Sequence, residues 1–324
     1  MTYSSGGLIQ ATDYNGFVST TAGANVNATW NSTYGQTALG TVSAGGTVTA
    51  TQWATLNTTI ASMANHQATT ITSRSGPTAG STISVQSAVN TDITNCYNNR
   101  YNAYASGAQY TAWTGTASQT AVVGHRNTTW TITFTDTVTF ANATAATNFF
   151  GAGGLIKIQF SKTSTGAQAD STWNSFITAC GTIWLSSTGA SKTISGGTYT
   201  GTTKTGGSGS ATTLATGTGF LQLTSSPTTI FKQFNSQYVY TGDYVQVDAS
   251  YNGSTALTLS TYWFSPARNV AGTTNEISGG TATTGISFGT APTTVVTYFP
   301  PETTYLTNTW GTPTVASTVS APTY

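Results

Sequence analysis

The sequence predicts an α+β fold that is mainly β, in which a small helical N-terminal unit precedes an antiparallel β-sandwich or jelly-roll-like domain. Two observations lead to this class. Apolar residues recur at three- and four-residue steps in the first third of the chain, and at every second residue after Gly107. The composition is rich in Thr, Gly and Asn with only 5% charged residues, which favours strands joined by tight turns.

The 324-residue chain divides at these changes of pattern into three predicted parts. Residues 1–106 are expected to form a helical assembly and attachment unit. Residues 107–299 are expected to form the β-sandwich-like domain, and residues 300–324 an extended C-terminal arm or edge strand. The 8 Trp, 16 Tyr and 13 Phe residues are ample material for hydrophobic cores, so we expect the chain to fold.

Three helices are predicted in the first part. Residues 49–66 carry a helical pattern, and a second stretch after Ser84, a candidate N-cap, has the same period. A weaker helix is expected around Tyr14, entered through Thr12 or Asp13. Thr and Asn are poor helix formers, so these helices should depend on tertiary or intersubunit packing. The apolar stripes are Tyr14, Phe17 and Val18; Trp53, Leu56, Ile60 and Met63; and Val85, Val89, Ile93, Cys96, Tyr97 and Tyr101.

The clearest strand covers residues 130–140, where large apolar residues alternate with threonine. A second strand, 155–160, follows the glycine-rich segment 151–154. One short helix, which contains Trp173, is expected to end at Gly181. Further strands are predicted at 182–186, 220–224, 229–234, 243–251, 257–264 and 293–299.

The charge and cysteine content narrow the possible partners. The formal net charge is +1 without a basic patch, which argues against a nucleic-acid partner. A surface of hydroxyl and amide groups does little to keep copies apart and barely responds to salt, which suits a repetitive assembly. Cys96 and Cys180 are expected to be buried free thiols. We expect no signal peptide and no membrane insertion, and therefore synthesis in a host cytoplasm.

The carboxylates show no pair marked for glycoside hydrolysis, which needs two of them close together across a sugar. Asp243 and Asp248 are five residues apart on one predicted strand, so their side chains should face opposite sides of the sheet. Capping or turn roles are expected for Asp13, Asp170 and Asp243. The eight carboxylates of the chain are Asp13, Asp92, Asp136, Asp170, Asp243, Asp248, Glu276 and Glu302.

The histidines and the glycine-rich loop also suggest no chemistry. His66 closes a helix, and His125 stands beside Arg126 with no obvious acid nearby. The two histidines lack the spacing of a zinc site. Segment 206–210 looks superficially like a phosphate-binding loop but lacks the required Gly-Lys-Ser/Thr order, so we expect a flexible loop. We therefore predict no catalytic residue, no cofactor and no metal.

One non-catalytic activity is considered, in which aromatic side chains on β surfaces stack on the sugar faces of a host glycan. The competing interpretation, which we favour, is that these side chains pack in the core or at interfaces. The candidate residues are Tyr238, Tyr240, Tyr244, Tyr262 and Trp263.

Distinctive segments occur along nearly the whole chain. They are Asp13-Tyr14-Asn15, residues 42–45 leading into 50–53, Asn65-His66-Gln67, residues 149–154, 178–182 and 206–214, Thr304-Tyr305-Leu306, and residues 310–315. In combination they resemble a family of virion structural proteins of tailed phages, especially cyanophages that infect marine cyanobacteria. The resemblance implies a capsid- or tail-associated component and carries over no catalytic residues. It further implies that the helical part attaches to the particle and the β part faces outward.

We therefore expect a non-enzymatic virion structural protein that acts through repeated contacts with copies of itself and with other virion proteins. Edge strands and the C-terminal arm are the expected means of joining copies. Two alternatives stay open. The first is a receptor-binding tail fibre or adhesin that recognises a host surface glycan. The second is a glycan-degrading enzyme, against which the scarcity of histidines and carboxylates argues.

Overall fold

The computed structural model describes most of the chain. It covers residues 10–19, 23–74, 86–103, 113–118, 123–124, 129–164, 168–237, 240–266, 286–287 and 291–320. Several residues singled out from the sequence lie outside the described residues, as does the side chain of Asp170. They are Ser84, Val85, His125, Tyr238 and Glu276.

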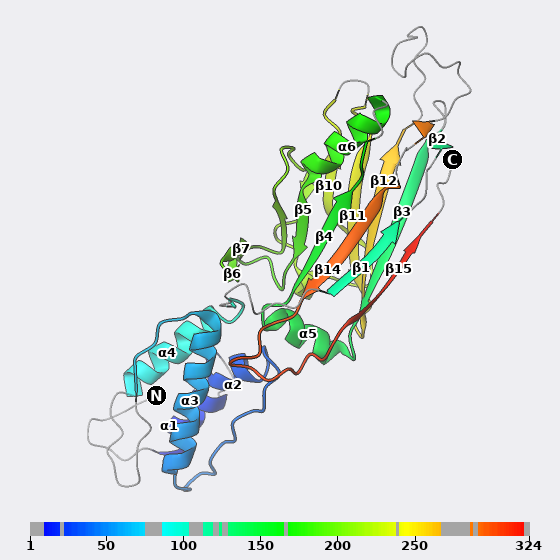
Figure 1. The fold of residues 1–324 in the computed structure, drawn as a ribbon. Coiled ribbons are helices and arrows are strands. Elements are labelled where there is room, and N and C mark those ends of the chain that lie inside the picture. The colour runs from blue at the N-terminus through cyan, green and yellow to red at the C-terminus, as the bar shows by residue number, and fades with distance from the viewer. Residues whose placement is uncertain are drawn as a thin grey trace.

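The predicted fold class is confirmed: the chain is α+β and mainly β, with a helical N-terminal region followed by a β-rich domain. Figure 1 shows helices α1 to α4 gathered at one end of an elongated molecule, with the two main sheets at the other end. The helices are α1 (Ala11–Ser19), α2 (Val26–Trp30), α3 (Ala50–Gln67), α4 (Gln86–Asn98), α5 (Ala143–Gly151) and α6 (Gln168–Cys180).

The start of α3 follows directly from local sequence. Thr49 accepts a hydrogen bond from the Gln52 backbone N–H, and the Gln52 side chain accepts one from the Thr49 backbone N–H. This reciprocal pair satisfies two N–H groups that the first turn of a helix leaves without partners. The helix ends at Ala68, whose left-handed backbone (φ 55°) closes the last turn.

Two antiparallel sheets form the β domain. One has five strands in the order β1-β14-β4-β5-β8, and the other has six in the order β15-β3-β12-β11-β10-β9. Short pairs β2–β13 and β6–β7 lie outside them. The strands are β1 (Trp113–Ser118), β2 (Val123–Gly124), β3 (Trp130–Thr139), β4 (Leu155–Ser161), β5 (Thr182–Leu185), β6 (Lys192–Ile194), β7 (Gly197–Tyr199), β8 (Thr202–Thr205), β9 (Thr213–Leu214), β10 (Thr228–Phe234), β11 (Tyr244–Tyr251), β12 (Ala256–Ser265), β13 (Ile286–Ser287), β14 (Thr293–Phe299) and β15 (Thr314–Val319).

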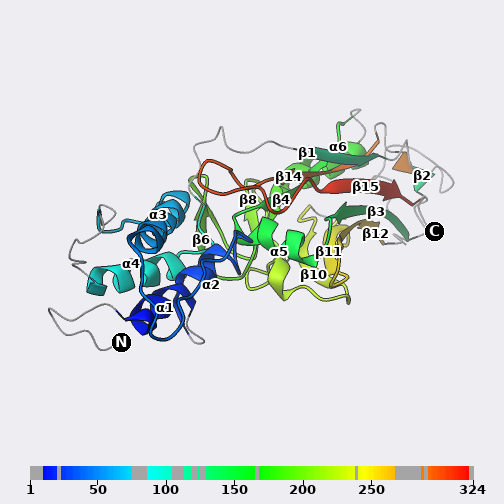
Figure 2. The same ribbon diagram turned by 90° about the horizontal axis from the view of Figure 1, so that it is seen from below.

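The two sheets pack face to face. In Figure 2 strands β1 and β14 lie above β11 and β12, with the core between the layers. Phe160 on β4 stacks on Phe231 on β10, with ring centroids 6.1 Å apart. Helix α6 places Trp173 against Trp130 and Trp263 of the six-stranded sheet, at 5.4 and 5.8 Å. The alternation along β3 is therefore that of a strand buried on one face.

The C-terminal part of the chain connects the two sheets through the helical unit. After β14 the chain runs from the five-stranded sheet to the helices and returns as β15 on the edge of the six-stranded sheet (Figure 1). We call residues 300–313 the strap. Its Leu306 and Trp310 are buried in the core. That core is continuous, because one cluster of buried apolar side chains includes Trp53 of α3 as well as Trp173 and Trp263 of the β domain.

One predicted strand is wrong. Residues 220–224 begin with a 3-10 helix, Phe220–Gln222, in which the Gln222 and Leu223 N–H groups donate to the Gly219 and Phe220 carbonyls three residues earlier. Phe220 and Leu223, three residues apart, both face inward, as the period of a 3-10 helix requires. Phe220 stacks on Phe150 of α5, with ring centroids 4.2 Å apart. Helices α2 and α5 were not predicted, and both are too short or too alanine-rich to show a clear apolar stripe.

The inner face of β3 contains one carboxylate, Asp136, at a position that the alternation would give to an apolar residue. Its Oδ1 accepts a hydrogen bond from the Ser317 hydroxyl of β15, and its Oδ2 has no partner in the described part of the chain. Burial raises the pKa of Asp136 to about 6, although the Ser317 hydrogen bond lowers it. The hydrogen bond between Asp136 and Ser317 thus joins the edge strand β15 to the sheet. Above about pH 6 the buried carboxylate is charged and poorly compensated, which is unfavourable.

Replacing Asp136 with Asn should remove a pH dependence of folding. Because the folded-state pKa lies above the unfolded value, the folded state binds more protons, and stability falls as pH rises from about 4 to about 6. The loss from this group amounts to about 3 kcal/mol above pH 6. Urea unfolding of the wild type and of Asp136→Asn across this range should show the fall only in the wild type. If stability depends on pH in the same way in the wild type and in Asp136→Asn, the assignment of this dependence to Asp136 is contradicted. Asp248→Asn, on the outer face of the sheet, is the control variant.

Candidate functional site

The predicted aromatic residues do not form one surface. Tyr240 and Trp263 are buried, in agreement with the favoured interpretation of core packing, so these two side chains are not available to stack on a glycan. Trp263 faces inward because it belongs to the buried alternation of β12. Tyr244 and Tyr262 are half-buried on the outer face of the six-stranded sheet. There Tyr244 stacks on Phe264 of β12 and meets Phe234 of β10, with ring centroids 4.5 and 5.4 Å away.

The structure shows what some of the acidic residues do. Asp13 accepts a hydrogen bond from the Gln10 backbone N–H at the start of α1, which is a capping role. Asp243 ends a tight turn that begins at Tyr240, and it is fully buried. Asp248 is half-buried and accepts a hydrogen bond from Thr229. The alternating burial along residues 243–248 places Asp243 inward and Asp248 on the outer face, as predicted, so they do not form a catalytic pair.

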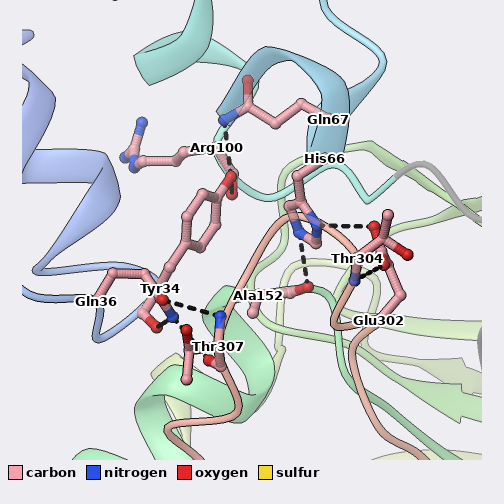
Figure 3. A network of polar contacts seen from close by, with 9 residues as sticks. All are labelled: Tyr34, Gln36, His66, Gln67, Arg100, Ala152, Glu302, Thr304 and Thr307. Atoms are coloured by element: carbon pink, nitrogen blue, oxygen red, sulfur yellow. Dashed lines mark hydrogen bonds and ion pairs between the residues drawn. The ribbon is translucent and has the colours of Figure 1, made fainter. Parts of the chain in front are cut away.

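A network of polar contacts lies where the strap meets the helical unit, and we call it the junction (Figure 3). The Gln36 side chain donates to the Thr307 carbonyl and accepts from the Thr307 N–H, at 2.9 and 3.0 Å. It therefore binds the strap as a neighbouring strand would. The Thr309 hydroxyl donates to the Tyr34 carbonyl at 2.9 Å, which fixes a second point of the strap.

Tyr34 connects three segments of the helical unit inside the junction. Its hydroxyl donates to the Arg100 carbonyl at 2.8 Å and accepts from the Gln67 amide at 2.7 Å. The side chain is fully buried, and this burial raises the pKa of Tyr34, although the hydrogen bond from Gln67 lowers it. Tyr34 is therefore a permanent neutral cross-link between the ends of α3 and α4.

His66 and Glu302 form the centre of the junction. His66 Nε2 lies 3.1 Å from the Ala152 carbonyl, which can only accept, so this nitrogen carries a hydrogen. Nδ1 faces Glu302 Oε1 at 3.8 Å, and both side chains are buried. Burial alone would raise the pKa of Glu302, but the neighbouring His66 and the Thr304 N–H hold it below its usual value. One histidine thus links α3, the end of α5 and the strap.

A second contact joins the helical unit to the β domain through the hairpin β6–β7. Ala103, just after α4, donates to the Thr193 carbonyl and accepts from the Ser195 N–H. Asn102 accepts from the Thr193 N–H at 3.0 Å. The hairpin is anchored by Lys192, whose buried ammonium donates to the hydroxyl of Ser186 and to two carbonyls. Burial lowers the pKa of Lys192 to about 8.

The glycine-rich segment 206–210 is anchored, so the expectation of a flexible loop is wrong. The Gly209 N–H donates to the Ala179 carbonyl at the end of α6, at 3.3 Å. Lys204 donates to the Gly209 carbonyl. Gly207 has φ +69°, and a side chain there would collide with the Ala179 carbonyl. The loop therefore forms one wall of a cavity beside α6.

Both cysteines are buried free thiols, as predicted. Burial raises the pKa of Cys96 and of Cys180 to about 12, so neither is a ready nucleophile. Within the described residues, no cluster of three His, Cys, Asp or Glu side chains could hold a metal ion. No described helix is both long and apolar enough to cross a membrane.

Comparisons with known proteins identify no relative. No protein-family model, no curated protein and no solved structure matches this chain.

Sequence reasoning singled out His66 but not its partners at the junction. Tyr34, Gln36 and Glu302 come from segments without helical or strand periodicity, so no pattern marked them. A signal was nevertheless present, because segments 65–67, 149–154 and 304–306 were noticed as distinctive. The structure brings all three together around His66.

A double-mutant cycle should measure the coupling between His66 and Glu302. We expect Glu302→Gln and His66→Gln each to lower the free energy of unfolding, with a coupling of about 1–3 kcal/mol because the two buried groups compensate each other. Because the pKa of Glu302 is lowered, the coupling should be present at neutral pH and lost as pH falls below about 4.

The readout is urea unfolding. A matched cycle that pairs Glu302→Gln with Asp248→Asn, on the outer face of the other end of the molecule, should give additive effects within about 0.5 kcal/mol. Additivity between His66 and Glu302 themselves would show that the junction does not depend on this pair.

Proposed function

We propose that this protein is a non-enzymatic structural component of a tailed-phage virion, capsid- or tail-associated, that acts through repeated contacts between copies and with other virion proteins. The observation that carries the proposal is how the chain uses its buried ionisable groups. His66 and Glu302 hold the strap, Asp136 holds β15, and Lys192 holds the hairpin β6–β7. Each fixes one segment to another.

The distribution of these groups supports a mechanical role over a catalytic one. Catalysis needs titratable groups that converge on a cavity open to a substrate. In the part of the chain that the structure describes, the cavity beside α6 is lined by neutral residues, and so is the depression between α2 and α5. The ionisable residues instead stabilise an elongated body whose two ends are firmly joined (Figure 1). The resemblance to virion structural proteins supports the same function.

Strand β15 offers a surface for contacts between copies. Among the described residues it pairs with β3 alone, and Thr314 to Val319 include no charged residue and no proline. Such an edge can accept a further strand, because nothing in it opposes pairing. The Ser320 N–H points to Thr133 of β3, so by alternation the N–H of Val319 points away from the sheet.

Light scattering on the purified protein tests the proposal. We expect a mass that is a multiple of 33.4 kDa and is the same at low and high salt, because so few charged groups are available for screening. A monomer under both conditions would contradict self-assembly.

A proline at the edge tests the route of assembly. Val319→Pro should reduce the assembly to monomer, because it removes an outward N–H without removing a bond to β3. The control Val319→Thr keeps the N–H and should assemble normally. Assembly of Val319→Pro at the wild-type mass would exclude β15 as the contact.

A further inference from the structure

The outer face of the six-stranded sheet carries a group of aromatic and charged side chains on β10, β11 and β12, which we call the face patch. Phe234 is 38% exposed and the other members are half-buried, so the patch is open to solvent in the described part of the chain. Aromatic side chains gathered on a surface are typical of contacts between proteins. The strand register arranges the patch in three rows, which are Phe234, Tyr244 and Phe264; Lys232, Gln246 and Tyr262; and Asp248 and Ser260.

The central ring of the face patch does not offer a flat platform for a sugar. Tyr244 stacks on Phe264 of β12, with ring centroids 4.5 Å apart and planes 18° apart. The Lys232 ammonium, from β10, lies 3.8 Å from the Tyr244 centroid. Because β10 and β12 flank β11, these two side chains cover the two faces of the Tyr244 ring. The patch therefore suits contact with a protein surface better than stacking on a glycan.

Lys232 and Asp248 are the two charged residues of the face patch, and neither forms an ion pair with another described residue. The Lys232 ammonium lies against Tyr244. Asp248 Oδ1 instead accepts hydrogen bonds from the Thr229 hydroxyl and the Gln246 amide, at 2.7 and 2.9 Å. The patch thus presents one positive and one negative group side by side. A partner surface must offer the same two charges in the opposite order, and the face patch of a second copy does so.

The strand register makes the face patch complementary to itself. Gln246 lies in the middle, with Lys232 beside it on β10 and Asp248 two residues further along β11. A two-fold axis that runs through Gln246 between two copies, diagonally to the strands, exchanges these two positions. Lys232 of each copy then faces Asp248 of the other. The same axis sets Tyr244 opposite Tyr262 of the other copy, and the two sheets cross at nearly a right angle, as in orthogonal sheet packing.

The contact is too small to hold two free copies together. Three strands about 4.8 Å apart and five residues that rise about 3.4 Å each cover a projected area of roughly 250 Å² per copy. A stable interface buries about 800 Å² per partner. The face patch should therefore act between copies that strand β15 already keeps close, where the effective concentration is high.

We propose that the face patch is a second contact between copies of this chain, in which Lys232 of each copy faces Asp248 of the other about a two-fold axis at Gln246. The inference rests on the proposed function, because repeated contacts between copies bring two such faces together. The Lys232–Asp248 pairs are enclosed between two sheets, where salt screens them less than it screens charges in open solvent. The contact is separate from the edge of β15 and uses other residues.

Disulfide trapping on the full-length protein tests the contact. Lys232→Cys and Asp248→Cys are purified separately, mixed in equal amounts and oxidised mildly at the total concentration used for each variant alone. The mixture should yield about tenfold more cross-linked pair than either variant by itself, because only unlike positions face each other. Gln246→Cys, on the axis, should cross-link without a second variant. The native thiols of Cys96 and Cys180 are buried and should not react.

A matched control uses Lys157, which also lies on an outer sheet face against an aromatic ring, 5.2 Å from the Phe299 centroid. Lys157→Cys mixed with Asp248→Cys should give no more product than either variant alone. The inference is overturned if Lys232→Cys with Asp248→Cys gives no more product than this control pair. That result leaves assembly through β15 intact. A wild type that is monomeric in light scattering contradicts the proposed function instead, because trapping also captures contacts too brief to change the mass.

Charge exchange in the Gln246→Cys protein gives a second measurement. Lys232→Glu sets like charges opposite each other and should lower the cross-linked yield about tenfold, since like charges across an interface are unfavourable. Adding Asp248→Lys restores opposite charges and should restore the yield. Lys232→Glu changes an outward side chain, so its urea unfolding should match that of Gln246→Cys alone. A yield that Lys232→Glu leaves unchanged would also overturn the inference.

Discussion

The strap is the constraint on which the rest of the structure depends. The chain leaves the five-stranded sheet at the end of β14, crosses to the helical unit and returns to the other sheet as β15. Gln36, Tyr34 and His66 hold it along the way, and Trp310 adds its ring to the core. Because one segment joins both sheets and the helices, none of these parts can move without disturbing the others.

Because the chain has few charged residues, its buried polar groups form hydrogen bonds mostly with neutral groups. With only 5% charged residues, the hydrogen bonds between distant segments come mostly from amides, hydroxyls and backbone groups. Such bonds carry a smaller desolvation cost than buried ion pairs, and salt does not weaken them. Several of the buried ionisable groups lie where two segments of the chain meet, as His66 and Lys192 do. This arrangement should leave the stability of the fold nearly independent of ionic strength.

The junction and the cavity beside α6 lie in different parts of the molecule. The helical unit and the strap form a rigid body at one end, while the cavity beside α6 lies in the β domain (Figure 1).

The sequence by itself indicated the class of the longer elements. Periods of three to four and of two residues marked α1, α3, α4 and the long strands, and Thr49 with Gln52 already specified a helix start. Only the tertiary structure decided which face of β12 is buried, and so placed Trp263 inside and Tyr262 outside. It alone placed His66 beside Glu302, and Gln233 and Asn235 beside α6. Periodicity reports the local backbone, whereas these contacts join segments that lie far apart in the sequence.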